Sequence, residues 1–180
     1  THERPSLFAR CLASTLHNIP SDVEILVLND SHDIQEVKHP QVQYFYNKFD
    51  NLSMNYEFVL GKARGEYVYY LEDDDYLVNN FYDIIDDYLK YDIIGASYYP
   101  DWNDDWIMKC STTMSKGFIL DDDVFQLGQF IMCRTLVDTF VFPKDSHIHN
   151  DRKLVDHVLG LSKTMINIPK IIYHQTTDGG

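Results

Sequence analysis

Four consecutive carboxylates at residues 72–75 stand directly after a strand-like run, and they constrain the fold more than any other stretch. Residues 67–71 are aromatic and β-branched, which predicts a buried strand. Adjacent acids repel one another unless a cation or hydrogen-bond donors meet them. Ligands of open α/β sheets bind beyond the carboxyl ends of strands, and Mg²⁺ or Mn²⁺ takes oxygen ligands there. The stretch is therefore either a metal–diphosphate site or an acidic turn in solvent.

Composition limits the classes of protein to consider. The 180 residues suit one domain with a proper core, and the net charge of −13 argues against binding nucleic acid mainly by neutralising phosphates. A locally basic groove stays compatible with that charge. We see no apolar run that would span a bilayer and no signal peptide. Cys11, Cys110 and Cys133 are odd in number and far apart, which indicates free thiols of a reducing compartment such as the cytoplasm.

Helical and strand patterns alternate along the first half, which predicts an α/β fold with a parallel sheet there and mixed pairing later. Neither a repeat nor a linker divides the chain. Residues 100–123 are the least patterned, and we expect short strands and a mobile loop there. The expected helices cover about 5–16, 53–63, 80–89, 135–140 and a segment from 150 or 151; the expected strands cover 23–28, 42–46, 67–71, 93–99, 129–133, 165–168 and 171–173.

The motifs then follow an order that resembles the GT-A glycosyltransferases, family 2 in particular, over nearly the whole chain. The matching pieces are THERP at 1–5, NDSHD at 29–33, ARGEY at 63–67, EDD at 72–74, a Gly-to-Arg segment at 128–134, ND at 150–151 and His174. The resemblance implies one nucleotide-diphospho-sugar transferase-like domain over 1–180, with a central, mainly parallel sheet flanked by helices. Residues 1–99 would form the nucleotide-sugar half and residues 100–180 the acceptor-binding and catalytic half.

Four departures from the family pattern stand out. The sequence begins where the family's first strand would end. The Asp-x-Asp motif begins with the longer Glu72, which moves the expected metal contact to Asp74. Asn55, Tyr56 and Glu57 stand where the family usually has Ala-Arg-Asn before the central strand, which removes a potential phosphate-facing arginine. Asn150 replaces a common glutamate.

The resemblance assigns the donor and metal sites. A nucleotide sugar, probably linked to UDP, would bind with Mn²⁺ or Mg²⁺ bridging its diphosphate and stabilising the leaving group. Asp74 is the first expected ligand and His174 a further ligand or a diphosphate contact; Asp75 is expected nearby. Donor-binding residues would be Thr1, His2, Arg4, Asp30, Glu72 and Asp73. Ordinary structural roles stay open for all of these, such as a loop cap for Asp30 or a surface residue for His174.

Transfer also needs a base for the acceptor hydroxyl. The resemblance implies Asp151 in this role, with inversion at the anomeric carbon; the alternative is an ordinary helix N-cap. Trp102, Trp106 and Asn150 are candidate acceptor contacts, and core packing is the alternative for the two tryptophans. The acceptor would be a glycan or another hydroxyl compound, with a modified nucleobase the one nucleic-acid case.

Three other functions are alternatives to sugar transfer. His147, His149 and Asp151 have the spacing of a zinc hydrolase motif, although Arg152 follows where a second-metal histidine would stand. A nucleotidyltransferase would usually carry a glycine-rich, basic N-terminal loop, and none is visible. A non-catalytic domain that binds a nucleotide sugar or glycan is the third alternative.

Overall fold

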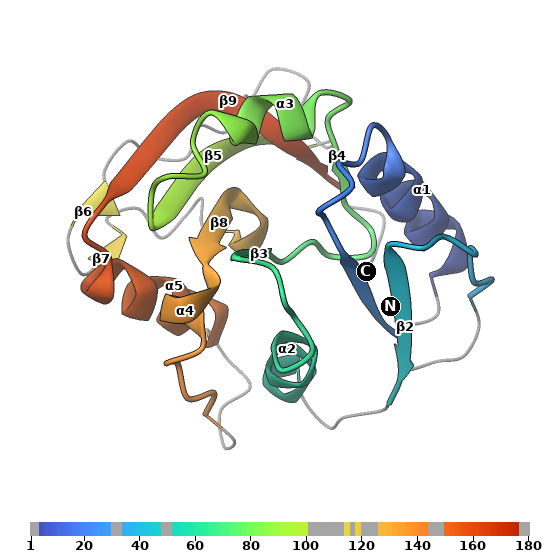
Figure 1. Ribbon diagram of the computed structural model, residues 1–180, viewed down its shortest axis with the longest axis horizontal. Helices are drawn as coiled ribbons and strands as arrows, with labels where there is room; N and C mark the ends of the chain where they lie inside the picture. The colour runs from blue at the N-terminus through green and yellow to red at the C-terminus, as the bar shows by residue number, and fades with distance from the viewer. Residues whose placement is uncertain are drawn as a thin grey trace.

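The computed structural model describes residues 4–29, 34–47, 52–100, 114–115, 118–119, 126–143 and 150–176. Figure 1 shows a large curled sheet arching over one side of the molecule and a small pair of strands on the other. The helices are α1 (Pro5–Leu16), α2 (Leu52–Leu60), α3 (Phe81–Asp86), η1 (Leu127–Gln129), α4 (Arg134–Val137) and α5 (Asn150–Leu161). The strands are β1 (Ile25–Asn29), β2 (Val42–Tyr46), β3 (Tyr67–Tyr69), β4 (Tyr76–Leu77), β5 (Ile93–Pro100), β6 (Met114–Ser115), β7 (Phe118–Ile119), β8 (Phe130–Cys133) and β9 (Met165–Gln175).

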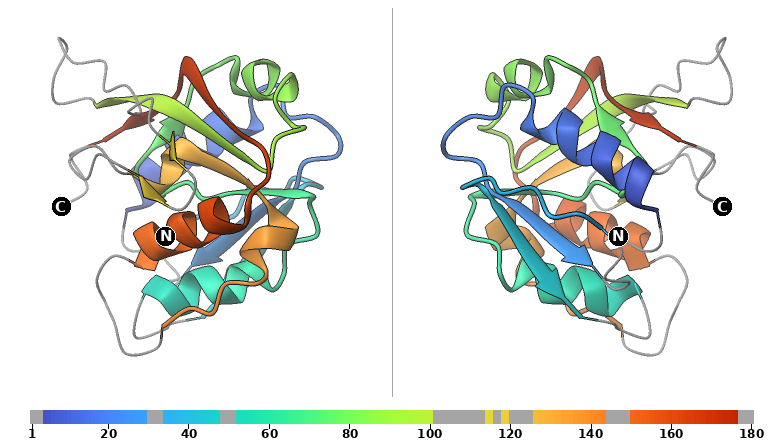
Figure 2. Two further views of the ribbon diagram at one scale, coloured as in Figure 1. Left: turned by 90° about the vertical axis from the view of Figure 1, so that its left-hand side faces the viewer. Right: turned by 90° about the vertical axis from the view of Figure 1, so that its right-hand side faces the viewer.

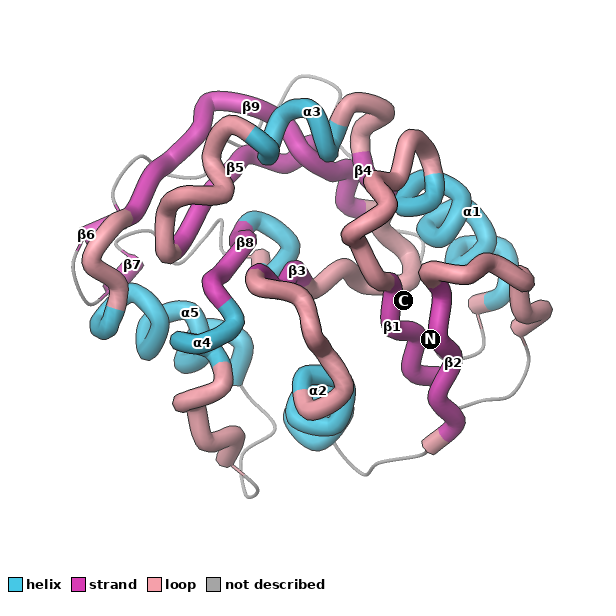
Figure 3. The backbone as a smooth tube through the Cα atoms, in the orientation of Figure 1, coloured by secondary structure: helices cyan, strands magenta, loops and turns pink. Residues whose placement is uncertain are grey.

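The largest sheet corrects the expectation of a mainly parallel core. Its order is β3-β8-β5-β9-β4, and only the β5–β9 pair within it is parallel. β8 runs antiparallel to both of its neighbours, β3 and β5. The parallel pairing predicted for the first half is confirmed for β1 and β2, which form a separate two-stranded sheet (Figure 3).

Two faces of the large sheet bury two different clusters. Along β8 the side chains alternate, so that Phe130 and Met132 pack with α2, α4 and α5 while Ile131 packs with α3 and β9. Figure 2 shows the α5 and α2 layer on one side of the sheet and α3 on the other. The sequence pattern of α5 is confirmed in this way, because its apolar residues face inward: Leu154, Val155, Val158 and Leu159 are all fully buried.

Several helices and strands begin or end at other residues than predicted. The two strands expected around Pro169 are one continuous β9 of 11 residues. Pro169 has no N–H to donate, and its place falls where the register with β5 shifts between Gly95 and Ser97. β3 ends at Tyr69, where its pairing with Ile131 ends, and is a half-buried edge strand. α2 ends at Leu60, followed by tight turns, and α3 ends at Asp86.

α1 connects the small sheet to the large one. Phe8 and Leu12 pack against Val27 of β1. On its other side, the Ser14 hydroxyl accepts a hydrogen bond from the backbone N–H of Leu77 at 2.9 Å, and the Tyr82 hydroxyl donates to the Thr15 carbonyl at 2.7 Å. This position brings the first turns of α1 against the loop between β3 and β4.

Candidate functional site

The acidic loop, residues 70–75 between β3 and β4, lies at the junction of the two sheets. Its turn is closed by the backbone N–H of Asp75, which donates to the Glu72 carbonyl at 3.2 Å. Asp74 and Asp75 are 7% and 6% exposed, so two of the four carboxylates are withdrawn from water. An acidic turn in solvent would leave them hydrated; here each needs a partner.

Arg4 supplies one of these partners. It immediately precedes α1, and its guanidinium pairs with the carboxylates of both Asp73 and Asp74. One oxygen of Asp74, Oδ1, is buried and accepts no hydrogen bond from the described residues. A buried carboxylate oxygen of this kind is suited to a hard cation. Arg4, Asp73 and Asp74 thus contact one another, and the roles predicted for them stay predictions.

Asp75 and the end of β9 meet on the other side of the acidic loop. The Thr176 backbone N–H donates to Asp75 Oδ1 at 2.9 Å. His174 pairs in register with Tyr76, and their rings stack with centroids 4.6 Å apart and an interplanar angle of 2°. His174 therefore lies beside the strand that directly follows the acidic loop.

Asp151 approaches the acidic loop from α5. It lies in the first turn of this helix, where negative charge is favourable, and its Oδ1 accepts the Arg152 backbone N–H at 2.7 Å. Asn150, the first helical residue, is buried and its amide donates to the Ser53 hydroxyl of α2. The helix begins at Asn150, which makes Asp151 a first-turn residue and not the N-cap.

Glu72 and Asp151 lie close enough for their charges to interact. Glu72 is exposed at the surface, and partial loss of hydration together with the neighbouring Asp74 raises the pKa of its carboxyl. Asp73 and Asp151 raise this pKa further, whereas Arg4 lowers it.

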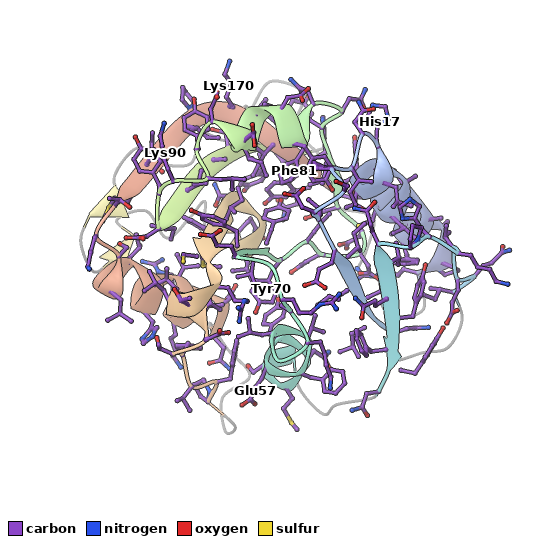
Figure 4. All side chains as sticks on the ribbon, in the orientation of Figure 1. His17, Glu57, Tyr70, Phe81, Lys90 and Lys170 are labelled. Carbon is purple, nitrogen blue, oxygen red and sulfur yellow. The ribbon has the colours of Figure 1, made fainter. Side chains whose placement is uncertain are left out.

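Tyr56 lies on the α2 side of the same space, at the position where the sequence departs from the family. Burial, then Glu72 and Asp151, raise the pKa of its phenol. Its ring lies 5.0 Å from that of Tyr70, which Figure 4 shows in the centre of the molecule above α2. Tyr56 is therefore a neighbour of the acids that the sequence analysis did not assign to the site.

Sequence reasoning also missed Arg10, Cys11 and Thr176. The Cys11 thiol lies 3.5 Å from the Glu72 carbonyl, and burial followed by the neighbouring Asp73, Asp75 and Asp74 raises its pKa. Cys11 and Cys133 are free thiols, as expected. The remaining predicted residues lie outside the described ones: Thr1, His2, Asp30, Trp102, Trp106, Cys110, His147 and His149.

The comparison with family models settles the class. Residues 1–141 match the model described as glycosyl transferase family 2. The chain belongs to this family. No curated protein matches it.

Solved structures of S. aureus TarS resemble this family 2 glycosyltransferase in fold. TarS 1–349 gives a TM-score of 0.76 at 15% identity, covering 98% of this chain and 58% of that one. The complex of TarS 1–349 with UDP-GlcNAc gives 0.72 at 16% identity, covering 96% and 55%. The complex with UDP gives 0.72 at 15% identity, covering 94% and 56%. The chain thus spans a little over half of the length of TarS 1–349.

Two further observations bear on cofactors and membranes. Within the described ranges, no three His, Cys, Asp or Glu side chains gather as a metal site on their own. A divalent ion held by one or two of these side chains would then complete its coordination with phosphate and water, as Mg²⁺ usually does. Among the described helices, none has the length and apolar character needed to cross a bilayer.

Proposed function

We propose that this chain transfers a hexose from a UDP-sugar to an acceptor hydroxyl, with a divalent ion at the acidic loop and inversion at the anomeric carbon. The observation that carries the proposal is the buried Asp74 carboxylate, which is paired with Arg4 through one oxygen and open at the other. UDP is favoured as the nucleotide because TarS, which shares the fold, has been solved with UDP and with UDP-GlcNAc.

In this proposal Asp74 and His174 hold Mn²⁺ or Mg²⁺. Such an ion, when bound, neutralises the negative charge that develops on a departing diphosphate. Arg4 is a cation beside the same loop and would share that neutralisation. Glu72 and Asp73 border the donor, and Thr1, His2 and Asp30 are proposed to contact its base and ribose.

Asp151 acts as the base. Its carboxylate is oriented by the Arg152 N–H and lies in the electrostatic environment of Glu72. It would take the proton from the acceptor hydroxyl as that oxygen attacks the anomeric carbon, and the bond from this carbon to the diphosphate oxygen breaks on the opposite face. Acceptor contacts are assigned to Asn150, Trp102 and Trp106. The acceptor is proposed to be a glycan or similar hydroxyl compound.

The two sequence halves are proposed to serve donor and acceptor within one domain. Strands from both halves alternate in the large sheet, which supports a single unit over 1–180. The free thiols support work in a reducing compartment such as the cytoplasm.

A thermal-shift panel tests the proposal. UDP, GDP, CDP and their sugars are each added with and without Mn²⁺ to the parent chain, to Asp74→Asn and to the control Asp87→Asn, an exposed residue just after α3. We expect a shift with UDP compounds that requires Mn²⁺, persists in Asp87→Asn and disappears in Asp74→Asn. A metal-independent shift, or a full shift in Asp74→Asn, would contradict the metal assignment.

Once an acceptor that is glycosylated has been found, Asp151→Asn is expected to lower kcat by about 10²–10⁴-fold while donor binding persists.

A further inference from the structure

A second arginine of α1, Arg10, reaches the acidic loop in a different way from Arg4. Its Nη2 donates to the backbone carbonyl of Asp74 at 2.9 Å and to the Thr176 hydroxyl. Arg4 pairs with carboxylates, whereas Arg10 binds a main-chain oxygen of the loop and leaves the Asp74 side chain to other partners. Arg10 therefore acts on where Asp74 lies, and not on its charge.

The same side chain also contacts Tyr76, the residue that stacks on His174. The Arg10 guanidinium lies 4.4 Å from the centre of the Tyr76 ring, and Tyr76 in turn stacks on His174. Thr176, which accepts from Arg10, donates its own N–H to Asp75. One guanidinium thus connects α1, the acidic loop and the last residues of β9.

We propose that Arg10 is a positioning residue that holds Asp74 and His174 in the arrangement needed for the divalent ion. The role rests on the proposed function, because it presumes an ion at Asp74. Lysine could not reproduce it. The two hydrogens of Nη2 serve two acceptors while the guanidinium carbon lies over the Tyr76 ring, and an ammonium group lacks these fixed directions.

Mn²⁺ titration by calorimetry on the full chain, with UDP present, tests this role. We expect Arg10→Lys to weaken Mn²⁺ binding by about 10–100-fold, the range seen when groups that orient metal ligands are removed. Thr176→Val, which removes one acceptor of Arg10, should weaken Mn²⁺ binding less than Arg10→Lys does. In the double variant, the loss of Mn²⁺ affinity should be smaller than the product of the two single losses. Arg64→Lys is the matched control, because Arg64 is exposed and pairs with Glu24; its Mn²⁺ affinity should equal that of the parent.

Hydrogen exchange separates positioning from general loss of stability. In Arg10→Lys the Thr176 and Asp75 amides should exchange faster, while amides of the fully buried β5 residues Ile93 and Ile94 keep their protection. Unchanged Mn²⁺ affinity in Arg10→Lys would overturn the proposal, and so would a loss accompanied by faster exchange in β5. The parent chain is titrated first. If it does not bind Mn²⁺, both the metal assignment and the role of Arg10 are overturned.

Discussion

Arg4 is the residue on which the charge balance of the acidic loop depends. It pairs with two carboxylates that are largely buried, with 12% and 10% of their side chains exposed. Removing the guanidinium leaves like charges facing one another with little water to separate them. The loop then needs another cation, and the proposed divalent ion is the natural replacement.

Arg4→Gln should therefore make stability depend on metal. Without divalent ions we expect a fall in Tm of about 2–6 °C, from the loss of about 1–2 kcal/mol of charge-assisted hydrogen bonding. Added Mn²⁺ should raise Tm more in the variant than in the parent. Differential scanning calorimetry with and without Mn²⁺ measures both, and Arg64→Gln provides a control arginine. An equal Mn²⁺ response in parent and variant would show that Arg4 and the ion do not share a site.

At the scale of elements, the link between α2 and α5 decides where Asp151 lies. The Asn150 amide donates to Ser53, and both residues are buried, at 6% and 4% exposed. Ser53→Ala removes this acceptor and should lower the free energy of unfolding by about 1 kcal/mol, or Tm by about 2–4 °C. Because Asp151 is the next residue, kcat should also fall, by about tenfold.

A matched serine separates these two effects. Ser162, at the far end of α5, is also buried, and its hydroxyl bonds the Leu159 carbonyl at 3.0 Å. Ser162→Ala should cost similar stability and leave kcat unchanged. If Ser53→Ala lowers Tm but not kcat, the α2–α5 link is structural and has no part in placing Asp151.

The positions of helices and strands along the chain were easier to predict from sequence than the contacts between them. The helix of α1 follows from Pro5 and the spacing of its apolar residues, and the acidic loop follows from its composition. Pairing is different, because Arg10 meets Asp74 and Thr176 across 64 and 166 positions of sequence, and nothing local encodes such a meeting. The sequence predicted mixed pairing in the second half but not which strand runs antiparallel, because an apolar run such as 129–133 has the same pattern in either direction.

At the scale of the whole molecule, two carboxylates accept hydrogen bonds from backbone N–H groups of distant segments. Glu24, just before β1, accepts the backbone N–H groups of Arg64 at 2.5 Å and Gly65 at 3.1 Å, which ties the small sheet to the start of β3. Asp92 likewise accepts the N–H groups of Lys163 and Thr164 ahead of β9. Burial opposes ionisation at both carboxyls, but the hydrogen bonds outweigh it, so both pKa values are lowered.

A lowered carboxyl pKa in the folded state favours folding above the pKa of the unfolded chain. This stability is lost as pH falls through the lower, folded pKa. Glu24→Gln should therefore lower Tm at pH 7 by about 2–4 °C, for the loss of about 1 kcal/mol of charge-assisted hydrogen bonding. The difference from the parent should shrink below about pH 4, where unfolded glutamate becomes protonated. Glu57→Gln, on the outer side of α2 (Figure 4), is the control and should follow the parent at every pH. Thermal unfolding from pH 3 to 7 decides the point, because a Glu24→Gln deficit that is constant across this range would mean that the charge of Glu24 does not hold the two sheets together.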